Sequence, residues 1–142
     1  MGNRLNGKVA LISGASGGLG AAQARMIAAE GAKVFLGDLA PEGSEFRVPL
    51  RALCDEIKEN GGEADYLQLD VTEESSWMAF VTTAEKRFGK VNVLSNNAGI
   101  YLHKSLTDHS AEDVHRVINV NQVGVTRSPT AWSSSHQTSH RL

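Results

Sequence analysis

The chain has 142 residues, of which 41% are hydrophobic and 21% are charged, so it is long enough to form one domain with a real core. Its formal net charge of −2 gives no general attraction to nucleic acids or anionic membranes. The single cysteine excludes an internal disulfide, and we find neither an apolar run of transmembrane length nor a signal-peptide core. These features predict a cytoplasmic protein that binds no nucleic acid and no membrane.

An apolar run followed by a glycine-rich turn begins the chain. The run predicts a strand over Lys8–Ser13, and the residues after the turn predict a helix over Leu19–Glu30. The turn between them has the spacing G-x-x-x-G-x-G, with Gly14, Gly18 and Gly20. Such a turn forms an anion site, because it exposes backbone N–H groups at a helix N-terminus. Glycine is common in any strand-to-helix connection, so the turn alone leaves the functional and structural readings about equal.

Three more strands are expected, over Lys33–Gly37, Ala64–Leu69 and Val91–Ser95. Helices are expected over Leu50–Asn60, over Glu73–Phe88 and from Ala111, each with apolar residues three and four positions apart. This alternation predicts an α/β fold with a parallel sheet and helices on both faces. Ligands of such sheets bind at the carboxyl ends of the strands, where four segments converge: Gly14–Gly20, Asp38, Asp70 and Asn96–Gly99.

Asp38 follows the second expected strand and stands 18 residues after Gly20. A carboxylate at this place can accept both hydroxyls of an adenosine ribose, and it repels a 2′-phosphate. Neither Ala15–Leu19 nor Leu39 supplies an Arg or Lys that would attract that phosphate. The combination predicts a preference for NAD over NADP, whereas Asp38 taken alone would be interpreted as a solvated loop acid.

Other polar residues of the converging segments have two interpretations each. Asp70 is either a turn residue before the next helix or an acceptor for the adenine amino group. Asn96 and Asn97 either form a turn or tie neighbouring strands together beside the cofactor. Asn121 lies on the apolar face of the last helix and is expected to be buried, as a structural link or as a group that orders a water or a carbonyl. Asn119 is expected to lie away from that face.

The end of the chain differs in composition from the rest. Eight of the 17 residues of Thr126–Leu142 are Ser or Thr, and Pro129 is expected to stop the last helix. We therefore predict a disordered Ser/Thr/His-rich tail over residues 126–142. His136 and His140 are four residues apart but lack helix support, and the other histidines lack ligand spacing, so no metal site is predicted.

Taken together, these motifs resemble the short-chain dehydrogenases/reductases, close to the NAD-dependent branch that includes bacterial hydroxysteroid dehydrogenases. The resemblance runs from about Leu5 to Val125 and is carried by Ser13-Gly14-x3-Gly18-Leu19-Gly20, Asp38, Asp70-Val71, Asn96-Asn97-Ala98-Gly99 and Asn119-Val120-Asn121-x2-Gly124. It implies a Rossmann-like, doubly wound parallel sheet of strand order 3-2-1-4, lacking later strands, with residues 1–125 forming a partial NAD-binding domain.

The resemblance also implies an activity and a set of site residues. The family transfers a hydride between NAD and a secondary alcohol or ketone, and its members often associate through the Asn-bearing helix, so a homo-oligomer is expected. Asn121 matches the family's catalytic Asn, which supports a proton-relay water. Cofactor contacts are implied for Gly14, Ser16, Gly18, Leu19, Gly20, Asp38, Leu39, Asp70, Val71, Asn97, Ala98 and Gly99.

The sequence departs from the family pattern at the residues that transfer the proton. The family needs a Tyr as general acid/base, a Lys four residues later and a Ser that polarises the carbonyl, all after the Asn-bearing helix. Tyr66 and Tyr101 both precede that helix, Lys104 follows Tyr101 at the wrong spacing, and nothing after Gly124 matches the family. We therefore expect a truncated, non-catalytic form of the oxidoreductase, with a nucleotide-binding or partner-binding module as the alternative.

Overall fold

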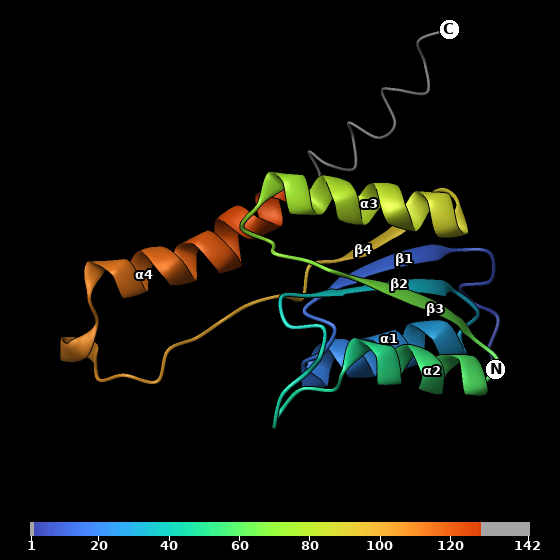
Figure 1. Cartoon of the computed structure of the whole chain (residues 1–142), viewed down its shortest axis with the longest axis horizontal. Coiled ribbons are helices and arrows are strands. Elements are labelled where there is room, and N and C mark those ends of the chain that lie inside the picture. Colours follow the sequence, from blue (N-terminus) through green and yellow to red (C-terminus); the bar gives the residue numbers. More distant parts are fainter. Residues whose placement is uncertain (1, 129–142) are drawn as a thin grey trace, which may run out of the picture.

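A computed structural model of the chain describes residues 2–128. Its centre is a four-stranded parallel sheet in the order β3-β2-β1-β4 (Figure 1). The strands are β1 (Val9–Ser13), β2 (Lys33–Asp38), β3 (Glu63–Gln68) and β4 (Val93–Ser95). The α/β class and the strand order expected from the sequence are therefore confirmed.

The predicted strand over Val91–Ser95 is shorter in the structure, because the side chain of Asn92 replaces a backbone partner. Asn92 N–H donates to the carbonyl of Val9 at 2.9 Å, while Asn92 Oδ1 accepts from Val9 N–H at 2.9 Å. The ladder between β1 and β4 consequently starts one residue later, where Ala10 lies opposite Val93.

Helices cover both faces of the sheet (Figure 1). On one face lie α1 (Gly18–Ala29) and α2 (Leu50–Glu59). The buried face of α2 has the three- and four-residue spacing expected from the sequence, and it consists of Leu50, Leu53, Cys54 and Ile57. Burial raises the pKa of Cys54 to about 12, which keeps its thiol protonated. Cys54 therefore packs as a small hydrophobic residue in the core.

The opposite face of the sheet is covered by α3 (Glu74–Phe88). Its buried residues are Trp77, Phe80, Val81 and Ala84, the stripe that the sequence spacing predicts. Phe80 lies 5.0 Å from Phe35 of β2, measured between ring centroids. The indole of Trp77 donates to the carbonyl of Val71 at 3.2 Å, so the one polar atom of this buried ring has a partner.

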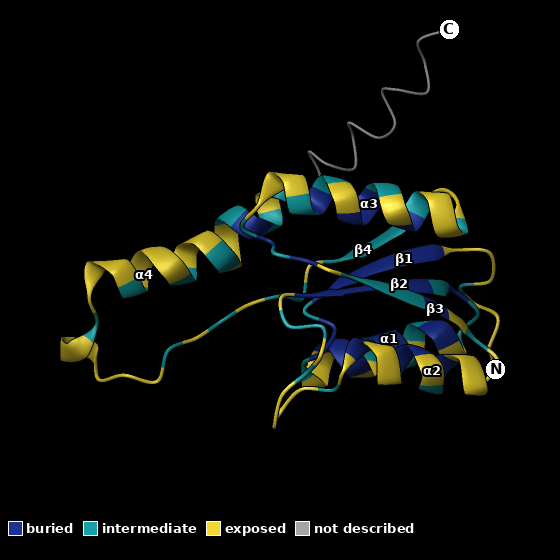
Figure 2. Ribbon diagram, in the orientation of Figure 1, coloured by how far each residue is buried: buried dark blue, intermediate teal, exposed yellow. Residues whose placement is uncertain are grey.

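After β4 the chain leaves the layers. It passes through the 3₁₀ turn η1 (Leu106–Asp108) into α4 (Ala111–Ile118), which projects away from the sheet and is largely exposed (Figures 1 and 2). Ser110 and Asp113 form a reciprocal capping box at its start, as their spacing predicts. The π-helical turn η2 (Asn119–Val123) follows, and residues 124–128 return to an α-helix.

The first residues of the predicted disordered tail have regular structure. Thr126, Arg127 and Ser128, the first residues of the predicted disordered tail, are helical, and Ser128 is buried. Its hydroxyl donates to the carbonyl of Val125 at 2.8 Å, so this buried polar group has a hydrogen-bond partner in its own helix. The rest of the predicted tail, from Pro129 on, lies outside the described residues. Among residues 2–128, no helix is both long and apolar enough to cross a lipid bilayer.

Candidate functional site

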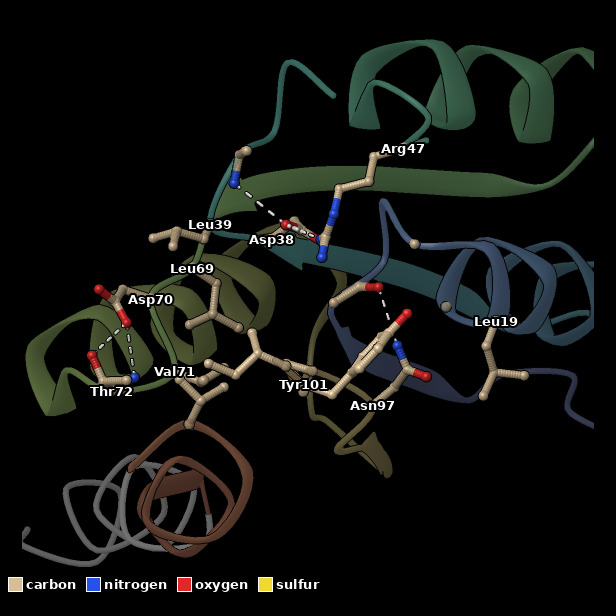
Figure 3. Close-up of a pocket in the computed structure, with 18 of the residues that line it drawn as sticks. Leu19, Asp38, Leu39, Arg47, Leu69, Asp70, Val71, Thr72, Asn97 and Tyr101 are labelled. Carbon is tan, nitrogen blue, oxygen red and sulfur yellow. Dashed lines mark hydrogen bonds and ion pairs between the residues drawn. The ribbon is translucent and has the colours of Figure 1, made fainter. Parts of the chain in front are cut away.

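A cleft of about 1000 Å³ opens at the carboxyl ends of the strands (Figure 3). Segments that follow all four strands line it, so the structure brings together the four regions that the sequence placed at this edge. Of the residues expected to contact the cofactor, all except Ser16 line the cleft. The volume lies at the upper end of the range for ligand pockets, which suits a large ligand.

The glycine turn forms the floor of the cleft between β1 and α1. Gly14 has a φ of +66°, a conformation that side-chain-bearing residues rarely adopt. A Cβ at Gly20 would collide with Gly14 O and would come within 2.9 Å of Ala15 Cα. The absence of side chains at these two positions therefore lets the start of α1 fold back against the end of β1.

Asn97 ties the end of β4 to this turn. Its Nδ2 donates to the carbonyl of Ser13 at 3.0 Å. It also donates to the carbonyl of Gly14 at 3.1 Å (Figure 3). The backbone N–H groups of Asn97 and Ala98 both donate to Ser13 Oγ at 3.1 Å. These contacts support the strand-tying interpretation of Asn97 over that of a simple turn residue.

The first turn of α1 faces the cleft without a capping side chain. The N-cap residue is Gly17, and none of the described side chains accepts a hydrogen bond as a cap there. At Gly18 an added Cβ would meet no atom within 4 Å, so the space in front of the first helical residue is open. The N–H groups and the positive end of the helix dipole are thereby presented to a ligand, and they favour an anion.

Asp38 is the buried charge of the site, with a side chain only 3% exposed. Its carboxylate accepts hydrogen bonds from the backbone N–H of Ser16 at 3.1 Å and of Ala40 at 3.3 Å. Ser16, which does not line the cleft, thus acts by holding this carboxylate. The interpretation of Asp38 as a solvated loop acid is wrong, because the glycine turn and its own following loop enclose it.

Arg47 also reaches Asp38, which the sequence analysis missed. One of its guanidinium nitrogens, Nη1, donates to both carboxylate oxygens of Asp38 at 3.1 and 3.2 Å (Figure 3). The residue comes from the loop between β2 and α2. The available signal in the sequence is that Arg47 is the one basic residue of this 11-residue loop, Leu39–Pro49.

Several other residues that line the cleft were also absent from the expected set, among them Thr72, Tyr101, Arg116 and Asn119. Arg116 and Asn119 are three residues apart and share the side of the last helix away from its apolar face, a spacing that could have identified them together. Tyr101 is 76% exposed and makes an edge-on contact with His103 at 5.0 Å between ring centroids.

Asp70 closes a turn ahead of α3. Its Oδ1 accepts from the N–H of Thr72 at 2.9 Å and from the Thr72 hydroxyl at 2.6 Å (Figure 3). This is the turn interpretation of Asp70, and it accounts for one of the two carboxylate oxygens. The residue also lines the cleft, so contact with a ligand is compatible with its turn role.

The expectation that Asn121 is buried is wrong. The residue is exposed and does not line the cleft; its Nδ2 donates to the carbonyl of Ile100 and its Oδ1 accepts from Ile100 N–H, both at 2.8 Å. The π turn changes the helical register after Ile118, so Asn121 does not continue the face that a regular helix would give it. The observed role is the structural link between the last helix and the segment after β4.

Among the residues that the structure describes, no group of three or more His, Cys, Asp or Glu side chains is placed to hold a metal ion. His136 and His140, which the sequence analysis considered and rejected as ligands, lie outside the described residues.

Comparison with known proteins gives relatives that are longer than this chain. It is 42% identical over 125 residues to 2,5-dichloro-2,5-cyclohexadiene-1,4-diol dehydrogenase of Sphingobium indicum, covering 88% of this chain and 48% of the relative. It is 41% identical over 125 residues to 3-alpha-(or 20-beta)-hydroxysteroid dehydrogenase of Mycobacterium tuberculosis, covering 88% and 45%. The chain thus spans about half the length of the curated relatives it matches.

Solved structures resemble this protein over the same region. A short chain dehydrogenase from Burkholderia cenocepacia in complex with NADP matches with a TM-score of 0.82 and 33% identity, over 93% of this chain and 52% of that one. An alcohol dehydrogenase from Thermococcus sibiricus, complexed with 5-hydroxy-NADP, matches with a TM-score of 0.79 and 37% identity, over 90% and 52%.

The family model described as short chain dehydrogenase matches residues 8–135. This match extends ten residues beyond Val125, so the expectation that nothing after Gly124 matches the family is wrong. The match covers most of the sequence, and it agrees with the strand order and with the cleft at the strand ends. The chain belongs to the short-chain dehydrogenase/reductase family, whose members use NAD or NADP.

Proposed function

We propose that this chain binds NAD in the cleft at the strand ends. The pyrophosphate lies against the first turn of α1, the adenosine ribose beside Asp38, and the adenine beside Asp70 and Val71. The observation that carries the proposal is the buried carboxylate of Asp38 next to the uncapped start of α1. One group accepts hydroxyl hydrogen bonds and the other attracts an anion, as an ADP-ribose moiety requires.

The described residues fit a dinucleotide on steric grounds as well. No atom lies within 4 Å of a Cβ added at Gly18, which leaves room for a phosphate at the helix start. Gly99 and Ala98 line the neighbouring wall with little or no side chain. We propose NAD as the preferred cofactor, because a carboxylate at the position of Asp38 repels the additional phosphate of NADP.

The chemistry proposed for the family site is hydride transfer between the nicotinamide and a secondary alcohol or ketone. Relatives named for cyclic alcohols, such as the cyclohexadiene-diol and hydroxysteroid dehydrogenases, support this substrate class. The 142 residues contain no Tyr-x-x-x-Lys pair that could serve as a proton acceptor. We therefore propose that the 142-residue chain by itself binds the cofactor without catalysing the reaction.

Calorimetric titration of the 142-residue chain with NAD tests the proposal. We expect saturable binding, which Asp38→Asn weakens by roughly tenfold because a charge-assisted hydrogen bond is lost. Asp55→Asn removes the same charge from an exposed position of α2 and should leave the affinity unchanged. The proposal fails if NAD does not bind saturably, or if the two variants behave alike.

A spectrophotometric assay separates binding from catalysis. The 142-residue chain with bound NAD is mixed with a panel of cyclic secondary alcohols, and the formation of NADH is followed by absorbance. The expected result is no turnover above the rate without protein. Turnover would show that another group accepts the proton and would end the non-catalytic part of the proposal.

Association with a second copy is a further part of the proposed function. The apolar side chains of Val114 and Ile118 on α4 are 46% and 41% exposed, which favours a partner on this helix. Light scattering should therefore give a mass above that of one chain, and Ile118→Asp should reduce it. A monomer at all concentrations would contradict this part.

A further inference from the structure

Arg47 occupies the part of the cleft where the proposed adenosine ribose lies. Its guanidinium pairs with both oxygens of Asp38, although the two side chains differ in exposure, at 41% for Arg47 and 3% for Asp38. The arginine therefore covers the buried carboxylate from the solvent side of the cleft (Figure 3). Within residues 2–128, its other guanidinium nitrogens have no hydrogen-bond partner, so they are available to a ligand.

The loop that carries Arg47 is held by backbone contacts that do not involve the guanidinium. Ser44 and Arg47 exchange two backbone hydrogen bonds, each 3.1 Å long, which close a tight turn. The next residue, Val48, donates its N–H to the carbonyl of Ser16 at 2.9 Å and packs against the core below α1 and α2. The backbone of Arg47 is thus fixed against the glycine turn, and its side chain is directed to Asp38 by the loop itself.

The ion pair changes what Asp38 can offer a ribose. The carboxylate has about four lone-pair sites, and it already accepts from Ser16 N–H, Ala40 N–H and the Arg47 guanidinium. These four hydrogen bonds fill the sites, so a ribose with two free hydroxyls must displace Arg47 from the acceptor positions that it occupies. A 2′-phosphate meets a different balance, because the planar guanidinium attracts a phosphate and offsets the charge of Asp38.

We propose that Arg47 is a specificity-determining residue that reduces the discrimination of this subsite against 2′-phosphorylated cofactors. By pairing with Asp38 it weakens the hold on a ribose with free hydroxyls, and by presenting its guanidinium it accepts the phosphate of NADP. The preference for NAD that Asp38 alone would give is therefore small in this chain. This inference rests on the proposed function, since it concerns the same cleft.

The test uses ADP-ribose and its 2′-phosphate, because these ligands probe the adenosine side without the nicotinamide. Calorimetry gives the dissociation constant of each for the unaltered 142-residue chain and for Arg47→Ala. We expect the variant to bind ADP-ribose more tightly and its 2′-phosphate roughly tenfold more weakly, since one charge-assisted contact to the phosphate is lost. The ratio of the two constants should therefore move by more than tenfold in favour of ADP-ribose.

Two further variants separate a specific contact from a general charge effect. Arg51→Ala removes one positive charge from an exposed position at the start of α2 that does not line the cleft, and it should leave the ratio unchanged. Arg47→Lys keeps the charge without the guanidinium fork, so its ratio should fall between those of the unaltered chain and Arg47→Ala. Thermal unfolding of Arg47→Ala should occur at a lower temperature than that of Arg51→Ala, because the buried carboxylate of Asp38 loses its cationic partner. Both dissociation constants are therefore measured well below the unfolding transition of the variant.

The possible failures have different meanings. A ratio that Arg47→Ala leaves unchanged, or changes no more than Arg51→Ala does, would overturn the role of Arg47 while the cleft still binds nucleotide. Binding of neither ligand to the unaltered chain would overturn the proposed function, and the inference about Arg47 with it.

Discussion

The sheet with its covering helices and the last helix, α4, differ in how far their apolar faces are buried. Residues of α1, α2 and α3 that face the sheet are buried. The cleft lies at the carboxyl ends of the strands that these helices cover. By contrast, α4 buries none of its residues within the described chain, although its sequence has a clear apolar face. Amphipathic spacing identifies a face but does not supply the surface that covers it.

This contrast explains why polar residues of similar sequence motifs lie in different environments. Asp38 and Asn97 are polar residues at strand ends, and the layers on both sides hold them in the cleft by several hydrogen bonds. Asn121 belongs to a helix without such layers and is joined to the rest of the chain through one residue, Ile100. The position of a polar motif residue is therefore fixed by several contacts where two packed elements meet.

The largest expected effect is on the layered part. Trp77 is fully buried, so Trp77→Ala should lower the free energy of unfolding by about 3–5 kcal/mol. Ile118 on α4 is 41% exposed, and Ile118→Ala should cost less than about 1 kcal/mol. Urea unfolding followed by circular dichroism measures both, and equal losses would contradict the contrast between the two regions.

The next effect concerns the glycine turn. Gly20→Ala should cost about 1–3 kcal/mol, because the new Cβ would collide with Gly14 O and come within 2.7 Å of Asn97 Nδ2. Gly18→Ala places the same methyl group two residues earlier, where no atom lies within 4 Å. The stability of this control should change by no more than about 0.5 kcal/mol. If Gly20→Ala melts at the temperature of Gly18→Ala, the close approach of α1 to β1 is not required for stability.

The smallest effect lies in α4, where local charges replace packing. Hydrogen bonds from the Lys104 ammonium and from the Ser110 N–H lower the pKa of Asp113 from 3.8 to about 2. Because the pKa is lowered in the folded state, the stabilisation is present above about pH 4 and is lost as the pH falls through about 2. Carboxyl carbon NMR titration measures this pKa.

A pair of lysine variants gives this titration its control. Lys104→Ala should raise the pKa of Asp113 towards 3.8, since the ammonium is the main cause of the shift. Lys90→Ala removes an exposed lysine that follows α3, and it should leave the pKa of Asp113 unchanged. If the pKa of Asp113 is the same in both variants and in the unaltered chain, the pair with Lys104 does not form in solution.

The parts of the site predicted from sequence are those fixed by short-range spacing. The stripe on α3 and the glycine positions follow from helix and turn geometry over a few residues, and Asp38 follows from the end of a buried strand. Arg47 could not be predicted in this way. Its position depends on the tight turn with Ser44 and on the anchoring of Val48 at Ser16, and neither contact has a spacing rule.

The environment of Asn121 escaped sequence reasoning for two physical reasons. Its expected burial assumed a covering surface for the last helix, and the sequence pattern does not show whether that surface is part of this chain. The π turn then moved the residue away from the expected face, because a wider turn breaks the regular helical register. Long-range packing and local irregularity both lie beyond the periodicity of a single segment.

The proposed nucleotide-binding site is the cleft at the strand ends. Amide-resolved NMR of the 142-residue chain during titration with NAD tests it most directly. We expect saturable shifts at Gly14–Gly20, around Asp38 and at Asp70–Thr72, while the amides of α4 from Ala111 to Val114 stay unchanged. Saturable shifts confined to α4, or no shifts at any amide, would contradict it.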